Sequence, residues 1–125
     1  MADSRKALGD RGEAFALAVY ERAGYRRVAC KYRSPYGEVD LIVELDDVVV
    51  FVEVKTRRVG SVTTPAEAVG YTKQQRIGKT ALYYLSQTGE KRQPRFDVFE
   101  LYVQNDRPKR YRMLKNAFAP RIESL

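Results

Sequence analysis

The chain has 125 residues, 44% of them hydrophobic and 31% charged, an ordinary globular composition that is most simply one domain over residues 1–125. It contains no histidine, which excludes Ser-His-Asp and Cys-His nucleophilic chemistry, imidazole-bound zinc, and nucleases with a histidine base. The net charge of +7 indicates a polyanionic partner, either nucleic acid or an acidic membrane surface, although charge that only maintains solubility would give the same value.

Three features predict a protein of the cytoplasm. The single cysteine, Cys30, excludes an internal disulfide and fits a reducing compartment. The first 13 residues, MADSRKALGDRGE, lack the apolar core of a signal peptide. No run reaches the roughly 20 apolar residues of a membrane span, so we expect no membrane partner.

The spacing of apolar residues predicts a helix over residues 4–23, ended by a left-handed cap at Gly24. Two glycines inside it, Gly9 and Gly12, are unfavourable in a helix and indicate close approach to another backbone or a ligand. The predicted inward face recurs at the helical period and comprises Leu8, Gly12, Phe15, Ala16, Val19 and Ala23.

Three strands are predicted next, followed by a basic and flexible loop. The second and third strands are joined at Asp46-Asp47, and the turn Ser34-Pro35-Tyr36-Gly37 ends the first. The expected strands are residues 26–33, 38–45 and 48–56, and the loop is residues 57–64.

A second helix is predicted with Thr72 as its N-cap, Gln75 completing a capping box, and Gly89 ending it. Strands over 95–103 and 111–114 follow, and Asp97 in the first of them is expected to be structural, paired to an arginine. The resulting order, α-β-β-β-α-β-β, predicts an α/β fold in which helices flank a mixed sheet.

The hairpin centred between Asp46 and Asp47 sets the cross-strand register. Leu45 then faces Val48, Asp40 faces Glu53, and Glu38 faces Lys55, for either a two-residue or a four-residue loop. Because side chains alternate along a strand, Glu53 and Lys55 project from one face.

Two carboxylates at opposed strand positions repel each other and lose hydration, so we expect protonation of one of them or a bound divalent cation. Mg²⁺ or Mn²⁺ suits carboxylate oxygens, backbone carbonyls and water. Lys55 would then steer a phosphate or help activate the attacking water. The alternative is a solvated strand face with a weak ion pair, and a one-residue bulge would separate Asp40 from Glu53.

The strings GEVDLI (residues 37–42) and FVEVKTRR (residues 51–58) resemble the PD-(D/E)xK nuclease superfamily, in which an acid precedes Glu-x-Lys on the next strand. The match is closest to the YraN-like family of predicted bacterial endonucleases, relatives of archaeal Holliday junction resolvases. The resemblance covers nearly the whole chain and includes Gly12-Glu13, Gly24-Tyr25, the second helix with Lys73 and Ala81, and RFDV at 95–98.

This resemblance implies a restriction-endonuclease-like fold and assigns roles to the motif residues. Asp40 and Glu53 would be metal ligands together with the carbonyl of Val54, and Lys55 would be the catalytic lysine. Glu13 would supply an additional acidic group from the first helix. The sequence departs from the superfamily pattern because Glu38-Val39-Asp40 replaces Pro-Asp, which leaves the acidic ligand in place.

The predicted activity is metal-dependent hydrolysis of DNA phosphodiesters by an endonuclease; the alternative is a non-catalytic nucleic-acid-binding module that keeps the nuclease fold. Branched or junction DNA is among the candidate substrates, and junction resolution would require two active sites and hence a homodimer. Gln75 has a second interpretation, as a helix cap only. The residues expected to contact nucleic acid are Arg57, Arg58, Lys73, Gln75, Arg76 and Arg11.

Overall fold

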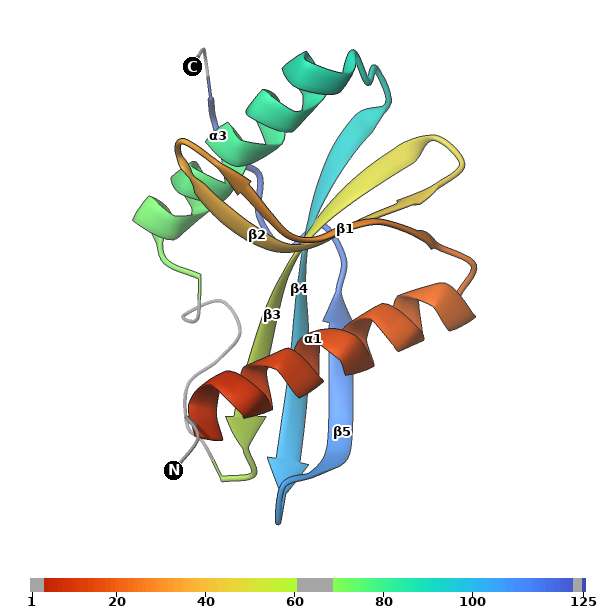
Figure 1. Cartoon of the computed structure of the whole chain (residues 1–125), viewed down its shortest axis with the longest axis vertical. Helices are drawn as coiled ribbons and strands as arrows, with labels where there is room; N and C mark the ends of the chain where they lie inside the picture. The colour runs from red at the N-terminus through yellow and green to blue at the C-terminus, as the bar shows by residue number, and fades with distance from the viewer. Residues whose placement is uncertain (1–3, 61–68, 123–124) are drawn as a thin grey trace.

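The structure is a computed structural model that describes residues 4–60, 69–122 and 125. Within these residues, five strands form one sheet, and helices α1 and α3 pack against it (Figure 1). In chain order the elements are α1 (Ser4–Arg22), β1 (Arg26–Ser34), β2 (Gly37–Leu45), β3 (Val48–Arg58), α3 (Tyr71–Thr88), β4 (Gln93–Gln104) and β5 (Arg107–Leu114). The predicted order and the α/β class are confirmed.

The sheet is mixed, and its spatial order β1-β2-β3-β4-β5 follows the chain. Each pair of neighbouring strands is antiparallel except β3 and β4, which run parallel. Parallel neighbours require a crossover connection, and α3 lies within it. The start of α3 lies beside the middle of β3, where Lys73 pairs with Glu53.

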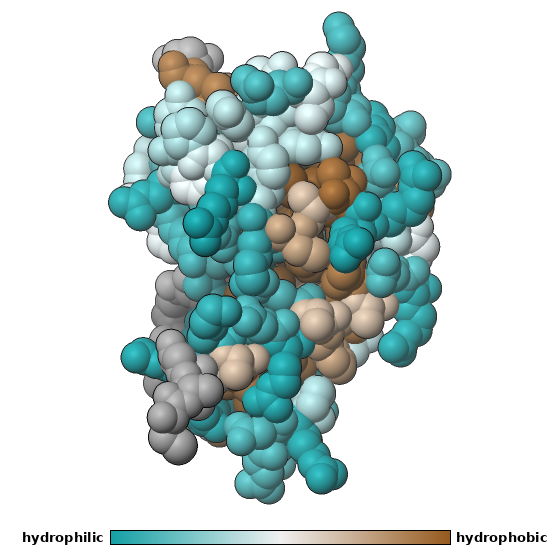
Figure 2. All heavy atoms as spheres, in the orientation of Figure 1, coloured by the Kyte–Doolittle hydropathy of each residue, from teal (hydrophilic) through white to brown (hydrophobic). Residues whose placement is uncertain are grey.

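Alternation of side chains divides the core into two apolar layers, which we call the α1 face and the α3 face of the sheet. On the α1 face, Tyr20 of α1 packs with Val52 and Phe99. On the α3 face, Ile77 of α3 packs with Phe51. Each fully buried side chain of this size contributes about 1.5–3 kcal/mol. Hydrophilic residues cover much of the side on which α1 lies, and hydrophobic residues show near its middle (Figure 2).

Both helices end at the predicted glycines. Gly24 has φ +99°, and Gly89, with φ +71°, donates its N–H to the carbonyl of Leu85 at 2.9 Å. These left-handed conformations are available to glycine at little cost. The predicted inward position of Ala23 is wrong: α1 stops at Arg22, Ala23 is exposed, and Tyr20 is buried instead.

The predicted capping box at the start of the second helix is wrong. Gly70 is the N-cap residue and makes no side-chain cap hydrogen bond. Its carbonyl accepts the first helical hydrogen bond from the Gln74 N–H at 2.9 Å. Thr72 and Gln75 therefore lie inside the helix and cannot form a capping box.

The predicted loop over residues 57–64 is wrong for its first two members. β3 continues to Arg58 because it pairs with β4 residue by residue, up to Arg58 opposite Val103. Residues 61–64 of that loop lie outside the described residues. Arg57 and Arg58 are consequently held by the sheet, and their side chains leave it on opposite faces.

Asp97 is a buried anchor between α1 and the sheet, as its predicted structural role requires. Its carboxylate is 0% exposed and accepts hydrogen bonds from the Tyr20 hydroxyl at 2.8 Å and from the Arg95 Nε at 2.9 Å. It also accepts the backbone N–H of Asn116 at 3.0 Å. A buried carboxylate with this many donors is satisfied, and removal of it leaves its partners without an acceptor.

Substitution Asp97→Ala is expected to lower the free energy of unfolding by about 3 kcal/mol, because it strands a buried hydroxyl and a guanidinium. Chemical denaturation monitored by circular dichroism measures the change. Asp10→Ala is the control, since it removes only exposed ion pairs to Lys6 and Lys31 and should have little effect on stability. Equal losses in the two variants would contradict the anchoring role.

The two glycines of α1 provide a matched pair for a second stability test. A Cβ atom at Gly12 would lie 1.9 Å from the Thr56 Oγ1, whereas one at Gly9 would meet nothing within 4 Å. Gly12 therefore makes a close approach, but to a side chain and not to the predicted backbone or ligand, and no protein atom described here approaches Gly9. We expect Gly12→Ala to destabilise the fold by about 1–3 kcal/mol through overpacking. Gly9→Ala should stabilise it by about 0.5–1 kcal/mol through helix propensity, as measured by the same denaturation.

Candidate active site

The site forms where β2 separates from β3. The predicted hairpin register is confirmed from Leu45 opposite Val48 as far as Leu41 opposite Val52, where the paired register ends. The predicted pairing of Asp40 with Glu53 and of Glu38 with Lys55 therefore does not occur within the ladder. Instead, the Asp40 Oδ2 accepts the backbone N–H of Val54 at 2.7 Å and replaces the missing strand partner.

Asp40 and Glu53 nevertheless come close enough to affect each other's charge. Burial raises the pKa of Asp40 to about 7, and the negative charge of Glu53 acts in the same direction. The N–H of Val54 opposes this shift by stabilising the carboxylate. Glu53 is only 4% exposed, so its charge also requires a nearby compensating group.

Two lysines converge on Glu53 from the α3 face. The Lys73 Nζ, from the first turn of α3, lies 2.7 Å from the Glu53 Oε1, and the Lys55 Nζ lies 3.6 Å from the same atom. Burial lowers the pKa of Lys55, and the proximity of Lys73 acts in the same direction. Burial alone would lower the pKa of Lys73 as well, but the hydrogen bond to Glu53 outweighs it and raises that pKa.

Glu13 approaches the site from α1. Its charge contributes to the raised pKa of Asp40, which places it in the same electrostatic environment. Its carboxylate is held by the Lys31 Nζ of β1 at 2.9 Å, and Lys31 also binds Asp10 at 2.9 Å. These two acids raise the pKa of Lys31, Glu13 first. Glu13 therefore lies near the site, and its carboxylate is paired with Lys31.

The donor set fits a hard divalent cation only in part. The carboxylates of Asp40 and Glu53 and the carbonyl of Val54 are oxygen donors of the type that Mg²⁺ and Mn²⁺ prefer. Among residues 4–60 and 69–122, no three His, Cys, Asp or Glu side chains are grouped closely enough to hold a metal by themselves. Water would therefore complete the shell, and the cation would share Glu53 with Lys73.

The predicted nucleic-acid contacts separate into two groups. Lys73 and Arg57 lie on the α3 face together with Lys55, whereas Arg58 points to the other side. There the Arg58 NH1 pairs with the Asp106 Oδ1 at 3.3 Å, and both side chains are exposed. The structure therefore joins Arg57 and Lys73 to the site and not Arg58.

The remaining predicted contacts lie at the edges of the site or away from it. The Gln75 Nε2 donates to the Arg121 carbonyl at 3.1 Å, so this amide is used to hold the C-terminal segment. Arg76 is exposed on α3, with its Cβ beside Gly37. Arg11 is exposed on α1 and lines a hollow with Asp106, near Arg58 rather than Lys55.

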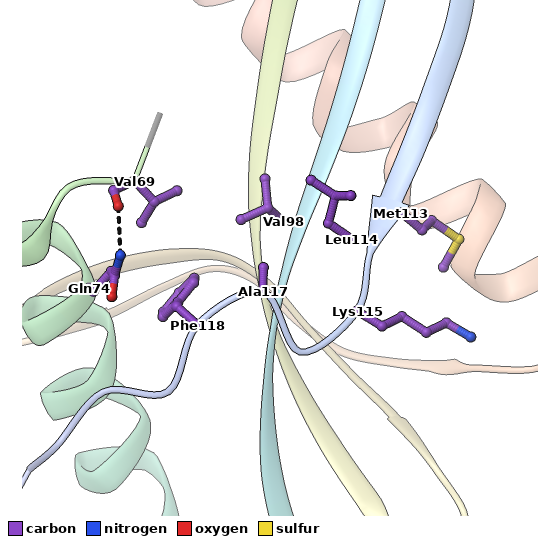
Figure 3. A pocket seen from close by; sticks show the side chains of 8 residues that line it. All are labelled: Val69, Gln74, Val98, Met113, Leu114, Lys115, Ala117 and Phe118. Atoms are coloured by element: carbon purple, nitrogen blue, oxygen red, sulfur yellow. Dashed lines mark hydrogen bonds between the residues drawn. The ribbon is translucent and has the colours of Figure 1, made fainter. Parts of the chain in front are cut away.

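A pocket of about 450 Å³ adjoins the site beyond Val98, the β4 residue in register with Glu53 (Figure 3). The C-terminal segment forms one side through Phe118, and the start of α3 forms another through Gln74, whose Nε2 donates to the Val69 carbonyl at 2.7 Å. This pocket is not predictable from the sequence, because residues 115–122 carry no periodic pattern that indicates where they pack.

Three further charged residues near the site were not among the predicted ones: Lys31, Glu100 and Arg112. Glu100 had a detectable signal: it is a carboxylate inside an apolar strand, as Glu53 is. Arg112 and Lys31 had none, because exposed-looking basic residues on edge strands are common.

Comparison with known proteins identifies the family of this chain. Residues 12–101 match the model of the family described as "Uncharacterised protein family UPF0102". A UPF0102 protein of Alkaliphilus oremlandii is 42% identical over 118 residues, which covers 90% of this chain and 98% of the relative. One from Nocardia farcinica is 48% identical over 100 residues, 79% of each chain. The chain belongs to the UPF0102 family, and the predicted YraN-like membership is confirmed.

Among solved structures, Pyrococcus furiosus SfsA in complex with Ca²⁺ is 17% identical, with a TM-score of 0.39. The alignment covers 92% of this chain and 64% of the SfsA chain, so the present chain spans less than two thirds of that protein.

In the described part of the chain, neither helix combines the length and the apolar character needed to cross a membrane.

Proposed function

We propose that this protein is a metal-dependent endonuclease that hydrolyses DNA phosphodiesters. One observation carries the proposal: the buried Glu53 lies beside Asp40, a carboxyl whose pKa is raised to about 7, with the Lys55 ammonium on the same strand face. Such perturbed groups cluster at functional sites more often than elsewhere. The net charge of +7 supports a polyanionic substrate.

Each residue has a distinct task in this proposal. Asp40 and Glu53, with the carbonyl of Val54, would hold Mg²⁺ or Mn²⁺. The bound ion would lower the pKa of water and neutralise charge on the phosphate. Lys55 is positioned by its strand to orient the attacking water and to stabilise developing negative charge. Lys73 supports Glu53 and adds positive charge where a phosphate would enter.

A second candidate function is a non-catalytic nucleic-acid-binding module. The observation that favours it is the neutralisation of the acids by lysines: Lys73 pairs with Glu53, and Lys31 pairs with Glu13. In that case the protein would bind DNA without cutting it in either Mg²⁺ or Mn²⁺. Resolution of branched DNA would further require a homodimer, which sedimentation of the protein with a four-way junction would detect.

Substitution Lys55→Ala is expected to lower cleavage by about 10²–10³-fold, because it removes one electrostatic contact to the transition state. The measurement is a metal-dependent cleavage assay on branched, single-stranded and duplex DNA. Lys91→Ala, an exposed lysine that follows α3, is the charge-matched control and should cut like the wild type. Unchanged metal-dependent cutting by Lys55→Ala would exclude the proposed mechanism.

Binding of Mn²⁺ measured by calorimetry tests the metal separately from cleavage. We expect the wild type to bind, Asp40→Asn to lose binding, and Lys73→Gln to bind more tightly, because its ammonium no longer competes for Glu53. Asp47→Asn changes the same charge at the exposed β2–β3 turn and should bind normally. A wild type that takes up neither Mn²⁺ nor Mg²⁺ would favour the non-catalytic module.

A further inference from the structure

Glu100 of β4 is a buried carboxylate that the proposed cleavage reaction does not use. It is 0% exposed, and neither of its oxygens has a hydrogen-bond partner in the structure. Two guanidinium groups lie beside it: the Arg57 Nε is 3.9 Å from the Glu100 Oε2, and the Arg112 NH1 is 3.9 Å from the Glu100 Oε1. The Arg57 Nε is itself buried without a hydrogen-bond partner.

The sheet register places this group next to the candidate active site. Glu100 is in register with Lys55 on β3 and with Arg112 on β5, so the three residues form a row across neighbouring strands. Phe99 and Leu101 belong to the core of the α1 face, so Glu100 between them projects from the α3 face. Neighbouring strands are about 4.8 Å apart, and the row therefore spans about 10 Å.

A buried carboxylate between two guanidinium groups orients both of them. Each guanidinium carries five N–H donors in a rigid planar fork, and the approaches to Glu100 at 3.9 Å are charge contacts that use none of them in a hydrogen bond. The side chain of Arg112 is 55% exposed and open to solvent, whereas that of Arg57 is 19% exposed and lies at the inner side of the group. The described contacts of both arginines consist of these approaches to Glu100 alone.

The ligand that fits two forks of this kind is a phosphate, because its oxygens accept paired N–H donors. Positive charge continues in the next row, where the Arg110 guanidinium lies 4.3 Å from the centre of the Tyr102 ring. We propose that Arg57 and Arg112, oriented by Glu100, form a subsite for a nucleic-acid backbone phosphate neighbouring the one at Lys55. The proposal rests on the nucleic-acid binding of the proposed function and not on cleavage.

The direction in which neutralising Glu100 changes DNA affinity distinguishes two roles of this residue: orienting the two arginines, or only adding to the overall charge of the protein. Glu100→Gln adds one positive charge to the protein, and long-range attraction alone would strengthen its binding to a polyanion. If Glu100 orients the arginines, the same substitution weakens binding. Asp47→Asn adds the same charge at an exposed turn away from the sheet row and shows the effect of attraction alone.

Fluorescence anisotropy with labelled single-stranded and duplex DNA, in EDTA so that no cleavage occurs, provides the test. We expect Arg112→Gln to bind about tenfold more weakly, and the slope of log affinity against log salt to fall by about 0.7 for single strands or 0.9 for duplex. Arg27→Gln removes an exposed arginine from the opposite edge strand and should leave the slope unchanged. The form of DNA whose affinity Arg112→Gln lowers by the larger factor is the one that supplies the phosphate.

We expect Glu100→Gln to bind about tenfold more weakly and Asp47→Asn to bind at least as tightly as the wild type. Thermal unfolding checks that each variant is folded, and if Glu100→Gln does not fold, Arg112→Gln decides the outcome. The subsite is overturned if Arg112→Gln has the same DNA affinity and salt slope as Arg27→Gln. It is also overturned if folded Glu100→Gln binds DNA as tightly as Asp47→Asn. Binding is measured without a metal, so these outcomes can be interpreted even if the protein does not cleave DNA.

Discussion

The hydrogen bond from the Val54 N–H to the Asp40 carboxylate determines the rest of the site. At this point β2 stops pairing with β3, and an unsatisfied backbone donor inside a sheet is costly. Asp40 supplies the acceptor and is thereby fixed against β3, beside Glu53. Glu13 of α1 and Lys73 of α3 both act on these two acids, Glu13 through its charge on Asp40 and Lys73 through its ion pair with Glu53.

The two faces of β3 have different tasks because side chains alternate along a strand. On the α1 face, Val50 and Val52 belong to an apolar core, and Asp97 on β4 ties Tyr20 of α1 to the sheet. On the α3 face, the same strand changes from apolar to charged after Phe51. The hydrophobic half holds the strand in place, and the charged half is presented with little freedom to move.

Charge compensation links these residues into one network. Glu53 is compensated by two lysines, Glu13 by Lys31, and Glu100 is approached by two arginines. A divalent cation would compete with the lysines for these buried acids, and the cations that face solvent are available to phosphate. The net charge of +7 is consistent with the proposed binding of nucleic acid by such a network.

Local chemistry in the sequence determined the element order, the glycine ends of both helices and the hairpin register next to Asp46-Asp47. These features depend on periods of a few residues and on conformations that glycine favours, both of which are visible along the chain. The tertiary structure alone decided where β3 ends, since its parallel pairing with β4 carries Arg57 and Arg58 into the sheet. It also decided that Lys73 reaches Glu53, and that Glu100 lies between Arg57 and Arg112. These pairs are brought together by the crossover through α3 and by strand neighbours, and no local pattern records which strand will lie beside which.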